Sequence, residues 1–373
     1  MAVKQVCLLC ERTSPSGNLF CQETDCPAEM SPTILNHGDW LGDIEIVKPV
    51  IVLRASVLYE AMHQKTKVYL KVAHPGHENK ERLKREAELL RSIQGPLRFS
   101  QQLPQLLPPY ANTTLREDAY GKIMLQGHLL YFLLFTYSEG EPLRHLLLKN
   151  PRLWLQHVGW IMASVATTVA YLQTRTLYHY GLSPDCVLVR FDAEQNVPRI
   201  LLFDLGIASK EQEVANYWHR PSALPAYMAP ELVDSHTVVK ASYRTDVYGL
   251  GIMLYELLVG EPAYPYTLRS AAEIAYAIDR QERTPSTRME HVAAKVADIA
   301  IQATNRDLMR VTLMHAKWQR RSLSSLVRYR KRNSVVGPAA ARFCLSPPPY
   351  WRFCSCWWWR TTRSGSNATM RSW

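Results

Sequence analysis

The sequence predicts an α+β fold behind a small cysteine-rich module, and three observations lead to that class. Two pairs of cysteines stand within the first 26 residues, and six short motifs follow one another between Val68 and Gly260. Apolar residues also recur at helical spacing in the run His291–Ile301. With 47% apolar residues, a chain of 373 residues has enough apolar side chains for a large domain and a small leading module.

The leading module is predicted from Cys7, Cys10, Cys21 and Cys26. Two residues separate the first pair and four the second, and ten residues lie between the pairs. Two thiolate pairs on two short turns make the tetrahedral four-cysteine set that Zn²⁺ prefers, and so small a module needs a metal to fold. We expect residues 1–32 to form a zinc ribbon. The alternative is four reduced, unligated cysteines in a disordered leader.

The most informative stretch, His179–Leu188, reads His-Tyr-Gly-Leu-Ser-Pro-Asp-Cys-Val-Leu and leads into an apolar strand. Five further motifs stand around it in order along the chain. They are Val68–Lys71, Arg85–Leu90, Asp204-Leu205-Gly206 behind the apolar run Ile200–Phe203, Pro225–Glu231, and Asp246–Gly260. Their order matters more than any single motif, because one short motif can match by chance.

Together these motifs resemble the Ser/Thr protein kinase family over roughly Asp43 to Asp307. The resemblance implies a bilobal protein-kinase-like fold of the α+β class. Its small β-rich lobe would span about 43–138 and its large helical lobe about 139–307. The resemblance also implies that Tyr137–Gly140 is the hinge between the lobes and that Asp246–Gly260 is the buried central helix of the large lobe.

A kinase covers the phosphates of ATP with a glycine-rich hairpin, because only glycine lets the backbone approach them closely. The three glycine positions of that hairpin fall here on Ile51, Leu53 and Ser56. The small residue at the floor of the adenine pocket is replaced by Tyr69, whose ring we expect to occupy the volume of adenine. The nucleotide site at these four residues and Lys71 is therefore predicted to be closed, which argues against ATP and magnesium as cofactors.

The catalytic loop keeps the family's frame but loses its polar side chains. The Asp that accepts the proton of the substrate hydroxyl is replaced by Gly181, and the Lys near the transferred phosphoryl group by Ser183. The Asn that holds Mg²⁺ is replaced by Cys186, whose soft sulfur suits that hard ion poorly. The sequence therefore predicts that no catalytic position of this loop is intact.

Three remnants of an active site are kept, at Lys71, Glu86 and Asp204. The resemblance implies that Lys71 pairs with Glu86 to position phosphate and that Asp204 binds Mg²⁺. With the hairpin and the loop altered, we interpret the first two as a structural ion pair that braces a helix against the sheet. We interpret Asp204 as a hydrogen-bonding residue of its own loop.

Targeting signals and cysteine usage favour a cytoplasmic protein without a membrane span. No signal peptide flanked by Lys or Arg opens the chain, and the apolar stretch Leu129–Phe135 is far shorter than the roughly 20 residues of a membrane helix. Metal binding explains four of the eight cysteines better than disulfides do. Cys344, Cys354 and Cys356 have no such pairing, and we expect them to be free thiols.

The last 66 residues differ in composition from the rest of the chain. They hold thirteen Lys or Arg and no Asp or Glu, and so account for the whole formal charge of +11. The family continues past the position of Asp307 with Pro-x-x-Arg and a final helix, and one C inserted after the Asp307 codon would permit such an ending. We interpret 308–373 as a disordered, frameshifted tail that replaces the final helix.

Two other interpretations of the tail stay open. The run Arg328–Arg332 places an aromatic residue among cations, which is typical of a nucleic-acid-binding arm. The Trp357–Trp359 run would suit a patch on a membrane surface, although neither it nor the Pro347–Pro349 run suits a packed domain.

The sequence therefore predicts a catalytically inactive pseudokinase that serves as a binding or regulatory scaffold for a protein partner. The alternative is an active Ser/Thr protein kinase that transfers phosphate from ATP to protein, and a nucleotide-dependent rise in melting temperature would favour it. A third class is a nucleic-acid binder that uses the zinc ribbon and the basic tail. A steep salt dependence of binding would favour that class.

Overall fold

The computed structural model describes residues 5–6, 13–14, 34–93, 102–125, 127–151, 153–191, 197–217, 225–233 and 240–264, with positions 273, 276–277, 280, 300 and 303–304. The chain divides into the compact units Met1–Ser324 and Ser325–Trp373, and every described residue belongs to the first. The four N-terminal cysteines, most of the run 291–301 and the tail 308–373 lie outside the described residues. No described helix is both long and apolar enough to cross a membrane.

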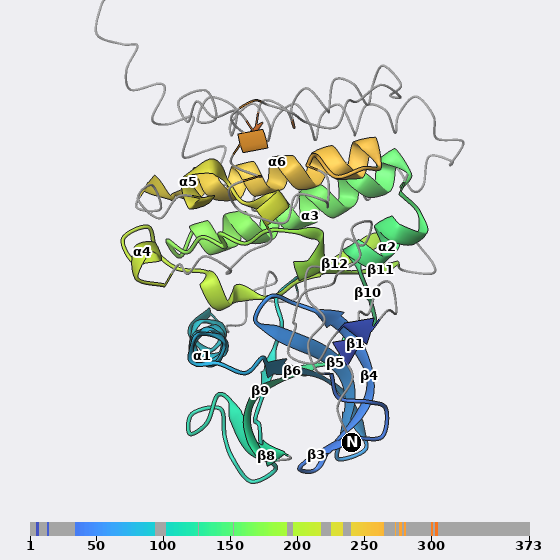
Figure 1. Ribbon diagram of the computed structural model, residues 1–373, viewed down its shortest axis with the longest axis vertical. Coiled ribbons are helices and arrows are strands. Elements are labelled where there is room, and N and C mark those ends of the chain that lie inside the picture. Colours follow the sequence, from blue (N-terminus) through green and yellow to red (C-terminus); the bar gives the residue numbers. More distant parts are fainter. Residues whose placement is uncertain are drawn as a thin grey trace, which may run out of the picture. The chain divides into compact units, whose positions relative to one another are not determined.

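A curled antiparallel sheet makes up the first part of the described chain (Figure 1). The strand order is β3-β4-β5-β6-β9-β7, and β8 pairs with β9. The strands are β3 (Trp40–Leu41), β4 (Ile44–Val52), β5 (Ser56–His63), β6 (Thr66–Ala73), β7 (Leu106–Leu107), β8 (Gly121–Leu125) and β9 (His128–Thr136). Helix α1 (His77–Ile93) follows β6 and lies beside this sheet.

Strand alternation decides which residues of the sheet meet α1. Val68 and Leu70 of β6 belong to a cluster on one face of the sheet, while Tyr69 packs into the core that also holds Leu83 and Ala87 of α1. Successive side chains of a strand point to opposite faces, so Lys71 shares the face of Tyr69. The candidate site residues of β6 therefore lie on the side of the sheet where α1 packs.

The turn between β5 and β6 joins paired His63 and Thr66 through only two residues. Gln64 and Lys65 both have positive φ, at 49° and 63°. A two-residue hairpin needs this left-handed backbone to match the twist of its strands, although glycine or asparagine is the usual choice. Nothing in the composition of this turn predicts it.

The remaining described elements are mostly helical, and α3 and α6 lie side by side (Figure 1). A small antiparallel sheet has the order β10-β11-β12. The elements are β10 (Glu141–Pro142), α2 (Leu143–Lys149), α3 (Leu155–Gln173), η2 (Pro184–Cys186), β11 (Val187–Phe191), β12 (Pro198–Leu202), η3 (Leu205–Ile207), α4 (Val214–Tyr217), η4 (Pro225–Tyr227), α5 (Pro230–Val233) and α6 (Tyr243–Val259).

Helix α6 is buried along almost its whole length, as the central helix of the expected fold should be. It begins at a capping box in which Ser242 accepts a hydrogen bond from the Arg244 N–H and Thr245 accepts one from the Ser242 N–H. It ends at Gly260, whose φ of 81° closes the last turn. Because α6 is buried, its polar residues need hydrogen-bond or ion-pair partners from the elements around it.

The N-terminal module contributes one described feature. Strand β1 (Gln5–Val6) pairs antiparallel with β2 (Thr13–Ser14). In the sequence, these two strands flank Cys7 and Cys10. A short antiparallel pair on either side of a Cys-x-x-Cys motif is compatible with the predicted zinc ribbon.

Candidate functional site

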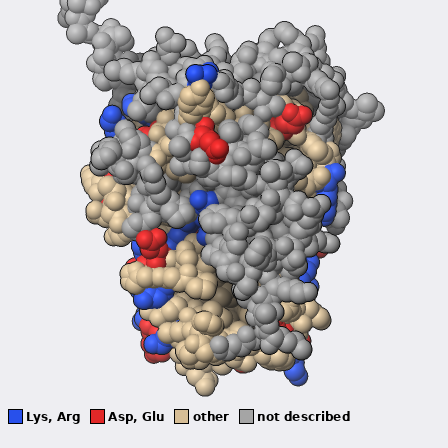
Figure 2. All heavy atoms as spheres, in the orientation of Figure 1, with Lys and Arg blue, Asp and Glu red and all other residues tan. Residues whose placement is uncertain are grey.

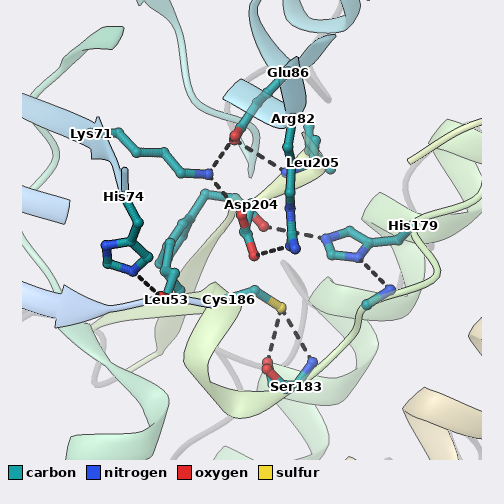
Figure 3. Close-up of polar contacts among 12 residues, drawn as sticks. Leu53, Lys71, His74, Arg82, Glu86, His179, Ser183, Cys186, Asp204 and Leu205 are labelled. Atoms are coloured by element: carbon teal, nitrogen blue, oxygen red, sulfur yellow. Dashed lines mark hydrogen bonds and ion pairs between the residues drawn. The ribbon is translucent and has the colours of Figure 1, made fainter. Parts of the chain in front are cut away.

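Four charged side chains from three elements converge on one point (Figure 3). The Nζ atom of Lys71 on β6 contacts Glu86 Oε2 and donates a hydrogen bond of 2.8 Å to Asp204 Oδ1. Arg82 reaches the other oxygen, Asp204 Oδ2, at 2.9 Å. The backbone N–H of Leu205 donates to Glu86 Oε1 at 3.1 Å. The ring of contacts thus ties β6, α1 and the segment at the start of η3 together.

The four charges of this cluster balance one another. Burial alone would lower the pKa of Lys71 and raise that of Asp204. The carboxylates of Asp204 and Glu86 outweigh burial at Lys71 and raise its pKa, while Arg82 and Lys71 hold the pKa of Asp204 well below its ordinary value. The side chain of Lys71 is only 2% exposed and that of Glu86 0%. Removing any one of these charges would therefore leave another charge buried without its partner, which is strongly destabilising.

The hairpin that corresponds to the glycine-rich loop is folded onto the end of β6. The backbone N–H of His74 donates to Ala55 O at 2.8 Å, and the His74 ring hydrogen bonds to Leu53 O at 2.8 Å. Since a carbonyl only accepts, this bond places the proton of the ring on Nε2. Ile51, Leu53 and Ser56, the three positions where the family has glycine, are all buried.

Tyr69 contacts the hinge segment through both its hydroxyl and its ring. Its hydroxyl donates a hydrogen bond of 2.7 Å to the backbone oxygen of Ser138, and its ring lies 5.0 Å from that of Tyr137. Tyr137 donates in turn to Glu60 Oε1 at 2.7 Å. With 1% of Tyr69 exposed, the ring is a packed part of the core.

The tip of the Ile207 side chain lies where a side chain at Gly181 would begin. A Cβ atom added there would lie 2.6 Å from Ile207 Cδ1, closer than such atoms approach. The neighbouring residue Tyr180 has a φ of 59°, and both it and His179 donate backbone hydrogen bonds to the carboxyl group of Asp246 at 2.8 and 2.9 Å. The loop is therefore held by the central helix α6.

The sulfur of Cys186 is turned toward its own loop. It accepts a hydrogen bond from the Ser183 N–H at 3.3 Å and donates one to Ser183 O at 2.9 Å. Burial raises the pKa of the Cys186 thiol to about 12, so the group stays protonated. A protonated thiol is not a metal ligand. Ser183 is likewise buried, and its backbone N–H and C=O groups hydrogen bond with Cys186 at the end of η2.

A second buried network is centred on Arg144 and was not predicted from the sequence. Arg144 of α2 donates to Glu256 at 2.9 Å, to both oxygens of Asp185 at 3.0 and 3.2 Å, and to the Tyr227 hydroxyl at 2.7 Å. The Tyr227 hydroxyl also contacts Glu256. Glu256 could have indicated this network from the sequence, because an acidic residue within a buried helix needs a buried partner.

Arg82 was also missed by the sequence analysis. It precedes Glu86 by four residues on α1, and residues at this spacing lie on the same face of a helix. The spacing would have placed Arg82 beside the predicted Lys71–Glu86 pair. Which carboxylate it contacts depends on where the η3 segment passes, and the helical pattern does not contain that information.

No group of three or more His, Cys, Asp or Glu among the residues with described coordinates could hold a metal ion. On the face drawn in Figure 2, basic and acidic side chains of described residues are interspersed.

A family model described as "Protein kinase domain" matches residues 55–330. The chain belongs to the protein kinase domain family. The family accounts for the curled sheet with α1, the hinge segment and the buried helix α6, and it confirms the kinase-like fold expected from the motifs.

Curated relatives include both kinase classes. Serine/threonine-protein kinase PrkC of Bacillus subtilis is 28% identical over 182 residues, which are 48% of this chain and 26% of PrkC. Serine/threonine-protein kinase PkaA of Streptomyces coelicolor is 30% identical over 167 residues, 44% of this chain and 29% of PkaA. Tyrosine-protein kinase FRK of Homo sapiens is 25% identical over 273 residues, 71% of this chain and 49% of FRK. The match thus spans less than a third of the length of PrkC or PkaA.

Proposed function

We propose that this chain is a pseudokinase, a protein of the kinase fold that transfers no phosphoryl group and serves as a binding or regulatory scaffold for a protein partner. The observation that carries the proposal is Gly181. The family's catalytic base is a carboxylate at this position. Here the position has no side chain and therefore no carboxylate, and the tip of Ile207 lies 2.6 Å from where a Cβ atom would stand.

The nucleotide side of the site supports the same proposal. The Tyr69 hydroxyl satisfies the backbone oxygen of Ser138 in the hinge segment, and the ring beside it fills core volume. His74 holds the backbone of the hairpin at Leu53 and Ala55. A nucleotide would have to displace the ring of Tyr69 and break these hydrogen bonds before it could bind.

Two observations favour the alternative of an active protein kinase. Lys71 and Glu86 are in contact, as phosphate positioning requires. The relatives PrkC and PkaA are named as serine/threonine-protein kinases. The two functions differ in one measurable quantity, the transfer of the terminal phosphate of ATP.

Phosphate transfer is tested with radiolabelled ATP, Mg²⁺ or Mn²⁺, and a mixture of Ser-, Thr- and Tyr-containing peptides. The pseudokinase proposal predicts that the wild-type chain incorporates no more label than a Lys71→Met variant. This variant is the matched control, because Lys71 positions phosphate in any active kinase. Incorporation that depends on Lys71 would establish the active-kinase alternative instead.

Two further proposals concern parts of the chain outside the described residues. We propose that Cys7, Cys10, Cys21 and Cys26 hold one structural zinc ion, and the pairing of β1 with β2 around the first cysteine pair supports this. We also retain the proposal that 308–373 is a frameshifted tail. Sequencing the gene across the Asp307 codon tests that proposal directly.

A further inference from the structure

Both oxygens of the Asp204 carboxylate are engaged by side-chain cations. Lys71 takes Oδ1 at 2.8 Å and Arg82 takes Oδ2 at 2.9 Å. The side chains of Arg82 and Asp204 are only 11% and 10% exposed, so this ion pair is largely shielded from water. An arginine cannot lose its charge in a protein, so the cation on Oδ2 is permanent.

The residues around Asp204 do not fit the Mg²⁺ that the kinase fold implies. Mg²⁺ needs hard oxygen ligands in near-octahedral geometry. Asp204 has no carboxylate oxygen without a cation on it, and the position of the second protein ligand is the buried, protonated thiol of Cys186. A Mg²⁺ ion at Asp204 would thus meet two cations already paired with that carboxylate, and a thiol in place of a second oxygen ligand.

Arg82 is held over Asp204 by close packing of α1 on η3. A Cβ atom added at Gly206 would lie 2.4 Å from Arg82 Cγ and 2.8 Å from Arg82 O. Only glycine allows the helix to come this near, and Figure 3 shows Arg82 extending from α1 directly toward Asp204. The position of Arg82 is thus fixed by backbone packing as well as by charge.

We propose that Arg82 is a built-in cation that takes the place of Mg²⁺ on Asp204. This inference rests on the proposed pseudokinase function and extends it. Arg82 neutralises Asp204 permanently and ties α1 to the η3 segment. The contacts among Lys71, Glu86 and Asp204 are then held together by the charges of the chain itself.

The first test uses the full wild-type chain and no nucleotide. Mn²⁺ is titrated and its binding is followed by electron paramagnetic resonance, with Asp204→Asn as the comparison. The proposal predicts that wild type and Asp204→Asn bind Mn²⁺ equally weakly and that excess Mg²⁺ leaves the wild-type melting temperature unchanged. A wild-type site that Mg²⁺ displaces, and that binds Mn²⁺ at least about tenfold more tightly than Asp204→Asn does, would overturn it.

The second test asks whether Arg82 and Asp204 act as one unit. Arg82→Met and Asp204→Asn should each lower the melting temperature, and the double variant should melt no lower than Arg82→Met alone. Arg85→Met is the matched control, because Arg85 is on the same helix but contacts Ala208 O and the ring of Tyr217. Its effect should add to that of Asp204→Asn. Additive effects of Arg82→Met and Asp204→Asn would overturn the proposal.

If the variants do not fold, the wild-type titration decides alone. One Mn²⁺ bound per chain and displaced by Mg²⁺ would overturn the proposal, because the cysteine sites prefer softer metals. The Mn²⁺ tests contain no ATP, so they separate the two proposals. A wild-type Mg²⁺ site would refute the role of Arg82, while Lys71-dependent phosphate transfer would refute the pseudokinase function.

Discussion

At the residue scale, Tyr69 is the side chain that we propose to occupy the nucleotide site. Its hydroxyl donates to Ser138 O, and its ring is buried against Tyr137. We expect Tyr69→Phe to lower the free energy of unfolding by about 1 kcal/mol, since it removes one buried hydrogen bond. Tyr69→Ala should lower it by about 3–5 kcal/mol, since it also leaves a cavity. Urea unfolding measures both changes.

The same pair of variants tests what Tyr69 does to the nucleotide site. We expect that Tyr69→Ala alone will not restore ATP binding, because Ile51, Leu53 and Ser56 still stand where glycine is needed. Equal stability of Tyr69→Phe and Tyr69→Ala would contradict the assignment of the ring as core.

Two buried histidines predict a loss of stability in mild acid. Burial lowers the pKa of His74 and of His179 to about 4 from the ordinary 6.5. Between these values the unfolded chain takes up protons that the folded chain does not, so the free energy of unfolding falls as the pH falls from 6.5 to about 4. The full effect is about 1.4 kcal/mol per pH unit for each histidine.

A single substitution isolates this contribution. We expect His74→Gln to remove about half of the histidine-dependent slope of stability against pH. Burial raises the pKa of Asp246 to about 7, which gives a slope of opposite sign, but this contribution is common to both proteins and cancels in the comparison. The exposed His128 provides a control in His128→Gln. Identical slopes for wild type and His74→Gln would show that His74 is not held neutral.

At the scale of elements, Arg144 joins four of them through its contacts with Asp185, Tyr227 and Glu256. We expect Arg144→Met to lower the free energy of unfolding by about 3–5 kcal/mol, because it leaves buried carboxylates without their cation. Urea unfolding measures the loss.

Lys149 on the same helix is the matched control for Arg144. Its side chain is 71% exposed and pairs with Glu141 at the surface. Lys149→Met should therefore change stability by at most about 1 kcal/mol. The double variant Arg144→Met with Glu256→Gln should cost less than the sum of its parts. Similar losses for the Arg144 and Lys149 variants would contradict the structural role of Arg144.

The N-terminal module is expected to depend on metal. Elemental analysis of the full wild-type chain should find about one Zn²⁺ per chain, and Cys7→Ser with Cys10→Ser should remove it. Cys354→Ser is the control and should retain the metal. Unchanged zinc in the variant that lacks the first cysteine pair would refute the assignment.

The elements that could be predicted from the sequence are those marked by a motif within a short stretch of the chain, or by the order of such motifs. The resemblance of Asp246–Gly260 to the family's central helix predicted the buried helix α6, and the resemblance of Val68–Lys71 to a kinase strand predicted β6. Contacts between distant segments were not predictable in this way. Arg82 meets Asp204 only because Gly206 lets α1 approach, and His74 meets Leu53 only because the hairpin folds back.

At the scale of the whole molecule, three separate sites of this kinase domain are filled or neutralised by side chains of the chain itself. Tyr69 bonds to the hinge segment, Arg82 neutralises Asp204, and Ile207 fills the space beside Gly181. The pseudokinase proposal interprets each contact as a group of the chain that stands where the family uses nucleotide, metal or catalytic base. This agreement among separate sites is the physical basis of the pseudokinase proposal.

Isothermal titration calorimetry of the full wild-type chain with ATP and Mg²⁺ tests that account most directly. Lys71→Met is titrated in parallel as the control. The account predicts no binding heat above dilution for either protein, because Tyr69 and the hairpin occupy the nucleotide site and Arg82 occupies the metal side of Asp204. A micromolar dissociation constant for wild type that is lost in Lys71→Met would contradict it.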